Sequence, residues 1–263
     1  MKLEITTVDA FTNRMFGGNP AAVILLPEPK PDAWLQSLAM ELNLAETAFL
    51  DSRDDGSYGL RWFTPTVEVD LCGHATVASA HVLWQIGALA EHEIARFHTR
   101  SGLLTATRRS DWIELDFPVT PVTEIAAPAG LLEALQVKPK FIGRTKFDYF
   151  LHVDEAELIA IKPNFAGLVK VAARGTIVTS SSSDHSYDFL SRFFAPASGI
   201  DEDPVTGSAH CALAPYWSAV LGKTAMIGRQ ASQRSGVIKV ELRGDRVLIS
   251  GQAVTVLTAQ LSC

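Results

Sequence analysis

The sequence is poor in cysteine, and its few cysteines do not suggest a pairing. Only Cys72, Cys211 and Cys263 occur in 263 residues, and no two of them form a Cys-x-x-Cys pair. An odd, widely spaced set argues against a disulfide framework and favours a reducing compartment, so we expect a cytoplasmic protein. The N-terminus also lacks the basic stretch followed by an apolar stretch that marks a signal peptide.

Long apolar runs and basic clusters are missing as well. No run approaches the ~18 residues that a membrane-spanning helix needs, so we expect no membrane association. The chain has 23 Lys and Arg against 29 Asp and Glu, and the basic residues do not cluster, which argues against a nucleic-acid partner. With 47% hydrophobic and 20% charged residues, it can bury a full core in one large domain or two smaller ones.

What the chain does contain is an internal repeat. Residues 61–65 read Arg-Trp-Phe-Thr-Pro and are followed by a Gly-His-Ala step at Gly73. Residues 192–196 read Arg-Phe-Phe-Ala-Pro and are followed by a Gly-Ser-Ala step at Gly207. Both steps open segments that are apolar nearly all round, which is typical of buried helices. The repeat therefore predicts two similar lobes, each wrapping strands around one helix.

A proline-rich stretch at 118–130 looks like the linker between these lobes. We therefore expect lobes at 1–119 and 120–263, with the last strand near the C-terminus crossing back to the first lobe. Within the second lobe, the apolar run 158–163 predicts a strand, and a helix is expected near 164–173.

The two predicted helix starts are candidate anion sites. The first N–H groups of a helix have no partner within the helix and carry the positive end of its dipole. Two such ends facing each other across a cleft would bind a carboxylate. For one copy alone, an ordinary Gly or Ser helix cap is the better explanation, but the paired copies reverse that preference and favour a binding site.

Five segments resemble one known family: "FGGNPAAV", "LNLAETAFL", "FTPTVEVDLCGHAT", "LDFP" and "DEDPVTGSAH". They are similar to motifs of the PhzF-like family, named for the phenazine-biosynthesis isomerase, and they span most of the chain. The resemblance implies the α+β fold of diaminopimelate epimerase, with two pseudo-symmetric lobes, each a β-barrel-like sheet around a central α-helix. It also implies an active site between the lobes, a small carboxylate substrate, no cofactor and a homodimer.

Together, the resemblance and the helix starts assign roles to seven residues. The resemblance implies Glu46, His74 and Asp203 as catalytic residues and Asn19 and Ser208 as substrate-binding residues. Gly73 and Gly207 are added as substrate-binding residues because they open the two predicted helices. The residues agree with this assignment, because moving a proton between carbons requires a carboxyl group near the carbon, and Glu46 lies in an apolar segment. We expect no metal site, since His81, His210 and Asp201 lack metal-ligand spacing.

One position departs from the epimerases of this fold, in which a cysteine opens each helix and the pair acts as two bases. Cys72 stands at the first such position, but the second holds Thr206, whose hydroxyl is no base near neutral pH. We therefore expect an isomerase that moves a proton between carbons through Glu46. An epimerase using Cys72 or Glu46 with another base, and a non-catalytic anion-binding protein, remain alternatives.

Overall fold

The computed structural model describes residues 3–171 and 173–262, and the chain divides into two compact units. The first unit comprises residues 1–116 and 250–263, and the second comprises residues 117–249. The division thus falls close to the expected boundary at residue 119. Residues 250–263 belong to the first unit, which is the placement expected of a last strand that crosses back to the first lobe.

The first unit is a sheet with one buried helix and one outer helix. Its strands are β1 (Leu3–Ala10), β2 (Asn19–Leu26), β3 (Glu46–Ser52), β4 (Tyr58–Phe63), β5 (Glu68–Val69), β6 (Ala95–Thr99), β7 (Gly102–Arg109) and β18 (Ala253–Leu261), and its helices are α1 (Asp32–Leu42) and α2 (Gly73–Gln85). Strand β8 (Trp112–Pro118) continues into the second unit. The pairing order is β18, β1, β2, β3, β4, β6 and β7, in which β2–β3 and β4–β6 are parallel and the other pairs antiparallel.

The second unit repeats this order with different strands. Its elements are β9 (Thr123–Glu124), α3 (Leu131–Leu135), β10 (Phe141–Arg144), β11 (Asp148–His152), α4 (Glu155–Ala160), α5 (Phe165–Leu168), β12 (Gly175–Ser181), β13 (Phe189–Ala195), η1 (Pro196–Ser198), β14 (Ile200–Glu202), α6 (Gly207–Leu221), β15 (Ala225–Gln230), β16 (Gly236–Arg243) and β17 (Arg246–Gly251). The order β9, β10, β11, β12, β13, β15 and β16 has parallel pairs at the same two places, β11–β12 and β13–β15. The predicted α+β fold with two similar lobes is confirmed.

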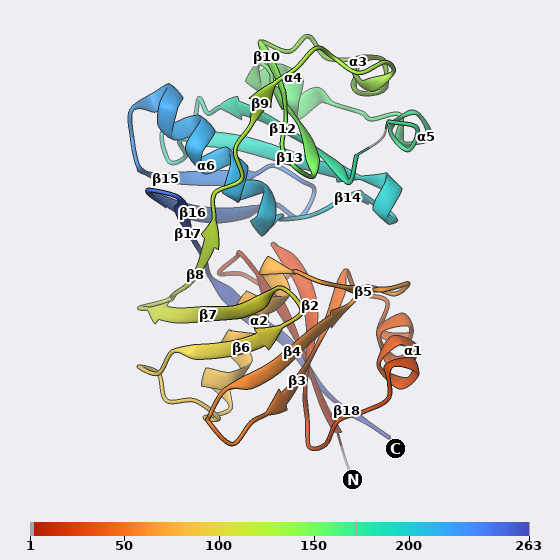
Figure 1. Ribbon diagram of the computed structural model, residues 1–263, viewed down its shortest axis with the longest axis vertical. Helices are drawn as coiled ribbons and strands as arrows, with labels where there is room; N and C mark the ends of the chain where they lie inside the picture. Colours follow the sequence, from red (N-terminus) through yellow and green to blue (C-terminus); the bar gives the residue numbers. More distant parts are fainter. Residues whose placement is uncertain (1–2, 172, 263) are drawn as a thin grey trace. The chain divides into compact units, whose positions relative to one another are not determined.

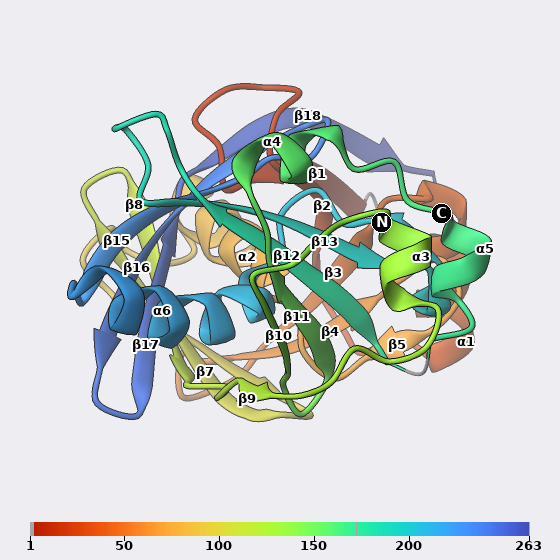
Figure 2. The same ribbon diagram turned by 90° about the horizontal axis from the view of Figure 1, so that it is seen from above.

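One apolar helix lies against the sheet in each unit. Figure 1 shows α2 behind β4 and β6 of the first unit, and ten of the 13 residues of α2 are buried. In the second unit, α6 runs alongside β15 and β16 in both views (Figures 1 and 2). Neither N-cap residue, Cys72 or Thr206, makes a side-chain capping hydrogen bond to the helix that follows it.

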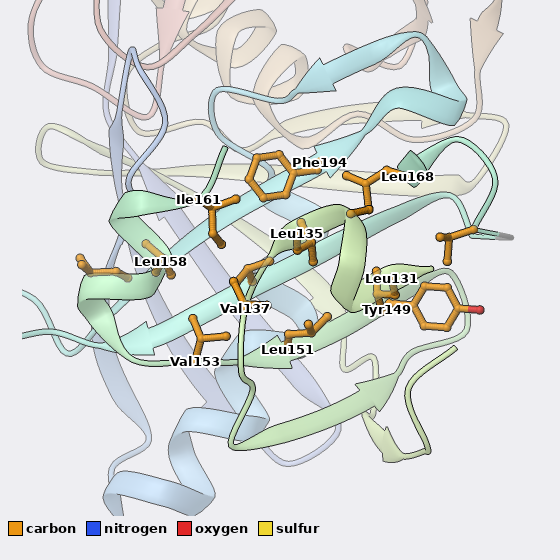
Figure 3. Packing of buried hydrophobic residues seen from close by; sticks show 14 residues of the cluster. Leu131, Leu135, Val137, Tyr149, Leu151, Val153, Leu158, Ile161, Leu168 and Phe194 are labelled. Atoms are coloured by element: carbon orange, nitrogen blue, oxygen red, sulfur yellow. The ribbon is translucent and has the colours of Figure 1, made fainter. Parts of the chain in front are cut away.

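The short helices α3, α4 and α5 pack against the sheet of the second unit through one hydrophobic cluster, whose labelled residues Figure 3 shows from close by. The strand predicted at 158–163 is wrong, because residues Glu155–Ala160 form α4. Leu158 and Ile161 pack in one cluster with Leu135 and Phe194, and acidic residues in the first turn of α4 favour a helix start. A short apolar run does not distinguish a strand from a helix, and in this segment the packing of the apolar side chains in the cluster favours the helix. Helix α5 is also shorter than the expected 164–173.

Among the described residues, no helix combines the length and the apolar character that crossing a membrane requires.

Candidate active site

Two neighbouring parallel strands of the first unit begin with polar residues. Asn19 is the first residue of β2 and Glu46 the first of β3, and Ala21 is the register partner of Glu46. Side chains alternate along a strand, so Asn19 lies on the same face as Ala21, and Glu46 on the same face as Ala48. Phe49 points to the opposite face, where it packs in the cluster that holds α1. The two polar side chains therefore face α2, at the end of the strands where that helix begins.

Glu46, His74 and Asn19 meet there in a connected buried group. The Nε2 atom of His74 lies 3.0 Å from Oε2 of Glu46, and its Nδ1 lies 3.1 Å from Nδ2 of Asn19. The three residues are only 9%, 4% and 0% exposed, respectively. When the imidazole is neutral and the Asn19 amide donates to Nδ1, the ring proton is on Nε2, the nitrogen that lies 3.0 Å from the Glu46 carboxyl group. The arrangement links a carboxyl group to a group that can give or take a proton.

Cys72 completes this buried group from the other side of the imidazole. Its Sγ atom lies 3.5 Å from Nδ1 and 4.0 Å from Nε2 of His74, and the residue is 6% exposed. The structure therefore places the sulfur among the polar atoms of the predicted site.

Burial and neighbouring charge act on both titratable partners of Glu46. Burial and the Glu46 carboxylate raise the pKa of the Cys72 thiol, so the thiol form is favoured near neutral pH. For His74, burial disfavours the imidazolium, but the Cys72 sulfur and the Glu46 carboxylate favour it, and the pKa of His74 is raised well above its usual value.

The donor atoms of Glu46, Cys72 and His74 all lie within 4.8 Å of one another, so these three residues could together hold a metal ion. Spacing along the sequence gives no sign of this set, because β3 and the start of α2 bring it together. Two other histidines, which lack metal-ligand spacing in the sequence, lie elsewhere. His81 Nε2 is 3.1 Å from Oγ1 of Thr255, and His210 is fully buried with Nδ1 2.8 Å from the Thr206 carbonyl.

Asp203, in the second unit, belongs to a hydrogen-bonded turn that leads into α6. Its carboxylate accepts from the Thr206 hydroxyl at 2.5 Å, and the Gln230 amide donates to the Asp203 carbonyl at 2.8 Å. The Thr206 amide donates to Gln230 Oε1 at 2.9 Å. This network fixes the approach to Gly207 and Ser208, the first two residues of α6.

An ion pair that sequence reasoning missed lies beside Ser208. Asp148 opens β11 and is 2% exposed, and it accepts from Nε and Nη2 of Arg174 at 2.9 and 2.5 Å. Arg174 Nη2 also lies 3.3 Å from Oγ of Ser208.

The structure thus groups Asn19, Glu46, His74 and Gly73 at the start of α2, and Asp203, Gly207 and Ser208 at the start of α6. The seven assigned roles, and the use of both helix starts for one ligand, stay predictions.

Known proteins resemble this chain over nearly its whole length. Residues 8–259 match the family model described as phenazine biosynthesis-like protein, PhzC-PhzF. An uncharacterized isomerase of Halalkalibacterium halodurans is 52% identical over 263 residues, covering 99% of each chain. The crystal structure of a PhzF-family protein from Enterococcus faecalis superposes with a TM-score of 0.95 at 39% identity, covering 100% of both chains. A hydroxyproline epimerase from Agrobacterium vitis, with bound trans-4-hydroxy-L-proline, shares only the fold, with a TM-score of 0.67 at 14% identity over 99% of this chain and 92% of its own.

These matches confirm the resemblance that the motifs carry, including the fold shared with epimerases. The relative from Halalkalibacterium places the chain among proteins named as isomerases. The chain belongs to the PhzC-PhzF family of phenazine biosynthesis-like proteins.

Proposed function

We propose that this protein is an isomerase that moves a proton from one carbon to another in a small carboxylate substrate, with Glu46 as the proton carrier. The observation that supports this most directly is the 3.0 Å contact between Glu46 and His74 in a buried setting. A carboxylate takes the proton from carbon, and the electron pair left behind delocalises toward the substrate's carboxylate. The same carboxyl group then returns the proton to a second carbon.

His74 and the helix starts have distinct parts in this proposal. His74 orients the Glu46 carboxyl group, and its raised pKa suits a group that stabilises negative charge. The backbone donors at Gly73 and Gly207, and the Ser208 hydroxyl, bind carboxylate oxygens and stabilise charge that develops on them. Asp203 is proposed as a second polar group for the substrate, and protein groups alone carry out the reaction.

An epimerase is the second candidate function, and the position of Cys72 supports it. Its sulfur lies close to His74, in the same group as Glu46. The equivalent position of the second unit holds Thr206, whose hydroxyl donates to Asp203. A pair of thiol bases is therefore absent at the two helix starts, and inversion would need Glu46 or Asp203 as the second base.

A screen of metabolites in deuterated water tests the proposal. The protein is incubated with small carboxylates, and mass spectrometry detects compounds that gain deuterium at carbon. We expect at least one such compound, labelled by the wild type and by Glu41→Gln, whose exposed carboxyl group on α1 serves as a matched control. Glu46→Gln should abolish the labelling.

The form of the product separates the candidates. A shifted double bond or proton position supports the isomerase, and inversion at one carbon supports the epimerase. Tight binding of carboxylates without deuterium uptake would contradict both and support an anion-binding protein.

A further inference from the structure

The buried group at the start of α2 has the composition of a metal site for a borderline or soft divalent cation. It offers one thiol, one imidazole and one carboxyl group, from Cys72, His74 and Glu46. Zinc and cobalt accept this mixture of sulfur, nitrogen and oxygen ligands, whereas magnesium and calcium prefer oxygen ligands alone. All three residues are at least nine-tenths buried, so they are held in place before any ion arrives.

The distances suit one ion touching all three side chains. Zinc bonds of about 2.0 Å to nitrogen and oxygen and about 2.3 Å to sulfur leave ligand atoms roughly 3–4 Å apart. His74 Nε2 lies 3.0 Å from Glu46 Oε2 and 4.0 Å from Cys72 Sγ. All three donor atoms lie within 4.8 Å of one another, so small side-chain rotations are enough to close the set.

The second unit supplies an internal comparison. Its register places Gly175 at the position of Glu46, because Thr47 pairs with Phe63 as Thr176 pairs with Phe194. Thr206 and Ser208 stand at the helix start where the first unit has its sulfur and imidazole ligands. None of these three residues is a ligand of the same kind, so the repeat predicts one such site per chain.

We infer that Glu46, Cys72 and His74 form a binding site for one zinc-like divalent cation, which blocks proton transfer by occupying the carboxyl group and the imidazole. Binding breaks the Cys72 S–H bond and forms a sulfur–metal bond, and the proton leaves to solvent. Nε2 and Oε2 bind through lone pairs, so the neutral ring carries its one proton on Nδ1, where the Asn19 amide turns to accept it through oxygen. Any further proton on the ring or on the carboxyl group leaves to solvent, and no group changes oxidation state. The inhibition rests on the proposed function, whereas the binding does not.

Titration of the full chain with Co²⁺ alone tests the binding without any substrate. All proteins carry Cys263→Ser, so that the terminal thiol does not contribute. We expect one Co²⁺ per chain, with the ultraviolet charge-transfer band of a thiolate–cobalt bond, and Zn²⁺ should displace the cobalt and remove the band. The absence of that band in the wild-type background would overturn the inference.

Variants then assign the ligands. Cys72→Ser should remove the band, and Glu46→Gln and His74→Gln should each weaken Co²⁺ binding at least about tenfold. Cys211→Ser, which removes the buried thiol on α6, is the matched control and should retain the band. A band that persists in Cys72→Ser would place the metal elsewhere and overturn the inference. Co²⁺ binding that is unchanged by both Glu46→Gln and His74→Gln would do the same.

A measurement on the unsubstituted chain covers the case in which a variant does not fold. X-ray absorption of the zinc-loaded protein should show one sulfur ligand with the remaining ligands nitrogen or oxygen, and a zinc shell without sulfur would contradict the site. Because neither spectrum depends on turnover, loss of the metal site and failure of the isomerase proposal are separate outcomes.

Discussion

The two units share their strand pairings but differ in the acid that stands beside the central helix. In the first unit, Glu46 opens β3 and contacts His74 of α2. In the second, Gly175 opens β12, and the acid is Asp148, one strand away, at the register position of Ala21. Asp148 pairs with Arg174, which stays charged under all ordinary conditions. One scaffold thus carries a carboxyl–imidazole pair that can exchange a proton, and a carboxylate–guanidinium pair that keeps its charges.

What both units have in common supports this comparison. Arg61 binds both carboxylate oxygens of Glu68, and Arg192 binds both of Glu202, with each bond at 2.7–2.9 Å. The guanidinium groups also lie over aromatic rings two residues along the strand, at 5.1 and 4.9 Å from the ring centres. Each of these bidentate ion pairs joins a short strand to its longer neighbour, just before the loop that leads to a helix start. The frame is therefore the same, and the difference is confined to the groups it holds.

Among the substitutions that test this comparison, Glu46→Gln has the largest expected effect. It keeps the shape of the side chain but removes the group that carries a proton, so turnover should fall by about 10²–10⁴-fold while ligand affinity is largely retained. The assay is deuterium exchange and turnover on a compound found by the metabolite screen, with Glu41→Gln as the control. A Glu46→Gln protein that keeps wild-type turnover would show that the first unit does not supply the proton carrier.

Arg174→Gln tests whether the pair in the second unit is a fixed charge pair. It leaves the Asp148 carboxylate buried without its guanidinium, and breaking a buried pair costs about 3–5 kcal/mol. Because the Arg174 side chain is 38% exposed, we expect about 3 kcal/mol, at the low end. Urea unfolding measures the loss.

The double substitution Arg174→Gln with Asp148→Asn is its control, since it removes both charges and should recover much of the stability. If Arg174→Gln alone proved as stable as the wild type, the pair would be dispensable, and the contrast between the units would lose its physical basis.

Much of the fold and part of the site follow from the sequence, for identifiable reasons. The repeat at Gly73 and Gly207 predicted the two helix starts. In both copies, an aromatic strand is followed by a glycine and then by an apolar run, and a pattern that spans so many residues is a reliable signal. The Arg174–Asp148 pair was not found, since its members are 26 positions apart and only strand pairing joins them. The position of the Cys72 sulfur beside His74 and near Glu46 was missed for a similar reason, because the sequence does not give the direction of a side chain at a helix start.

The equivalent helix positions Thr76 and His210 provide a pH-dependent test. Thr76 donates to the Cys72 carbonyl and His210 contacts the Thr206 carbonyl, at 2.5 and 2.8 Å. Burial lowers the pKa of His210 to about 4, well below its usual 6.5. The folded state therefore prefers the neutral ring. The contribution of the His210 ring to the free energy of unfolding is complete above pH 6.5 and is lost as the pH falls toward 4. The expected loss from this group is about 2 kcal/mol by about pH 5.

Unfolding in urea at a series of pH values, with the wild type and His210→Thr, measures this contribution. The substitution copies the residue of the first unit and removes the titrating ring, so its stability should fall less steeply between pH 6.5 and 4. Equal slopes for the two proteins would contradict a buried neutral His210.

Cys72→Ala has the smallest expected effect and sharpens the comparison at the helix starts themselves. In an epimerase with two thiol bases, both units would need a thiol before the helix, but the second unit has Thr206, whose hydroxyl is engaged with Asp203. Cys72 therefore lacks a matching base, and its burial favours the neutral thiol. With Glu46 as the proton carrier, we expect Cys72→Ala to keep turnover within about tenfold of the wild type, far from the loss expected for Glu46→Gln. The same deuterium-exchange assay, run together with optical rotation of the product, decides the point. A Cys72→Ala protein as inactive as Glu46→Gln, or an inverted product that depends on the thiol, would make Cys72 a base and support the epimerase.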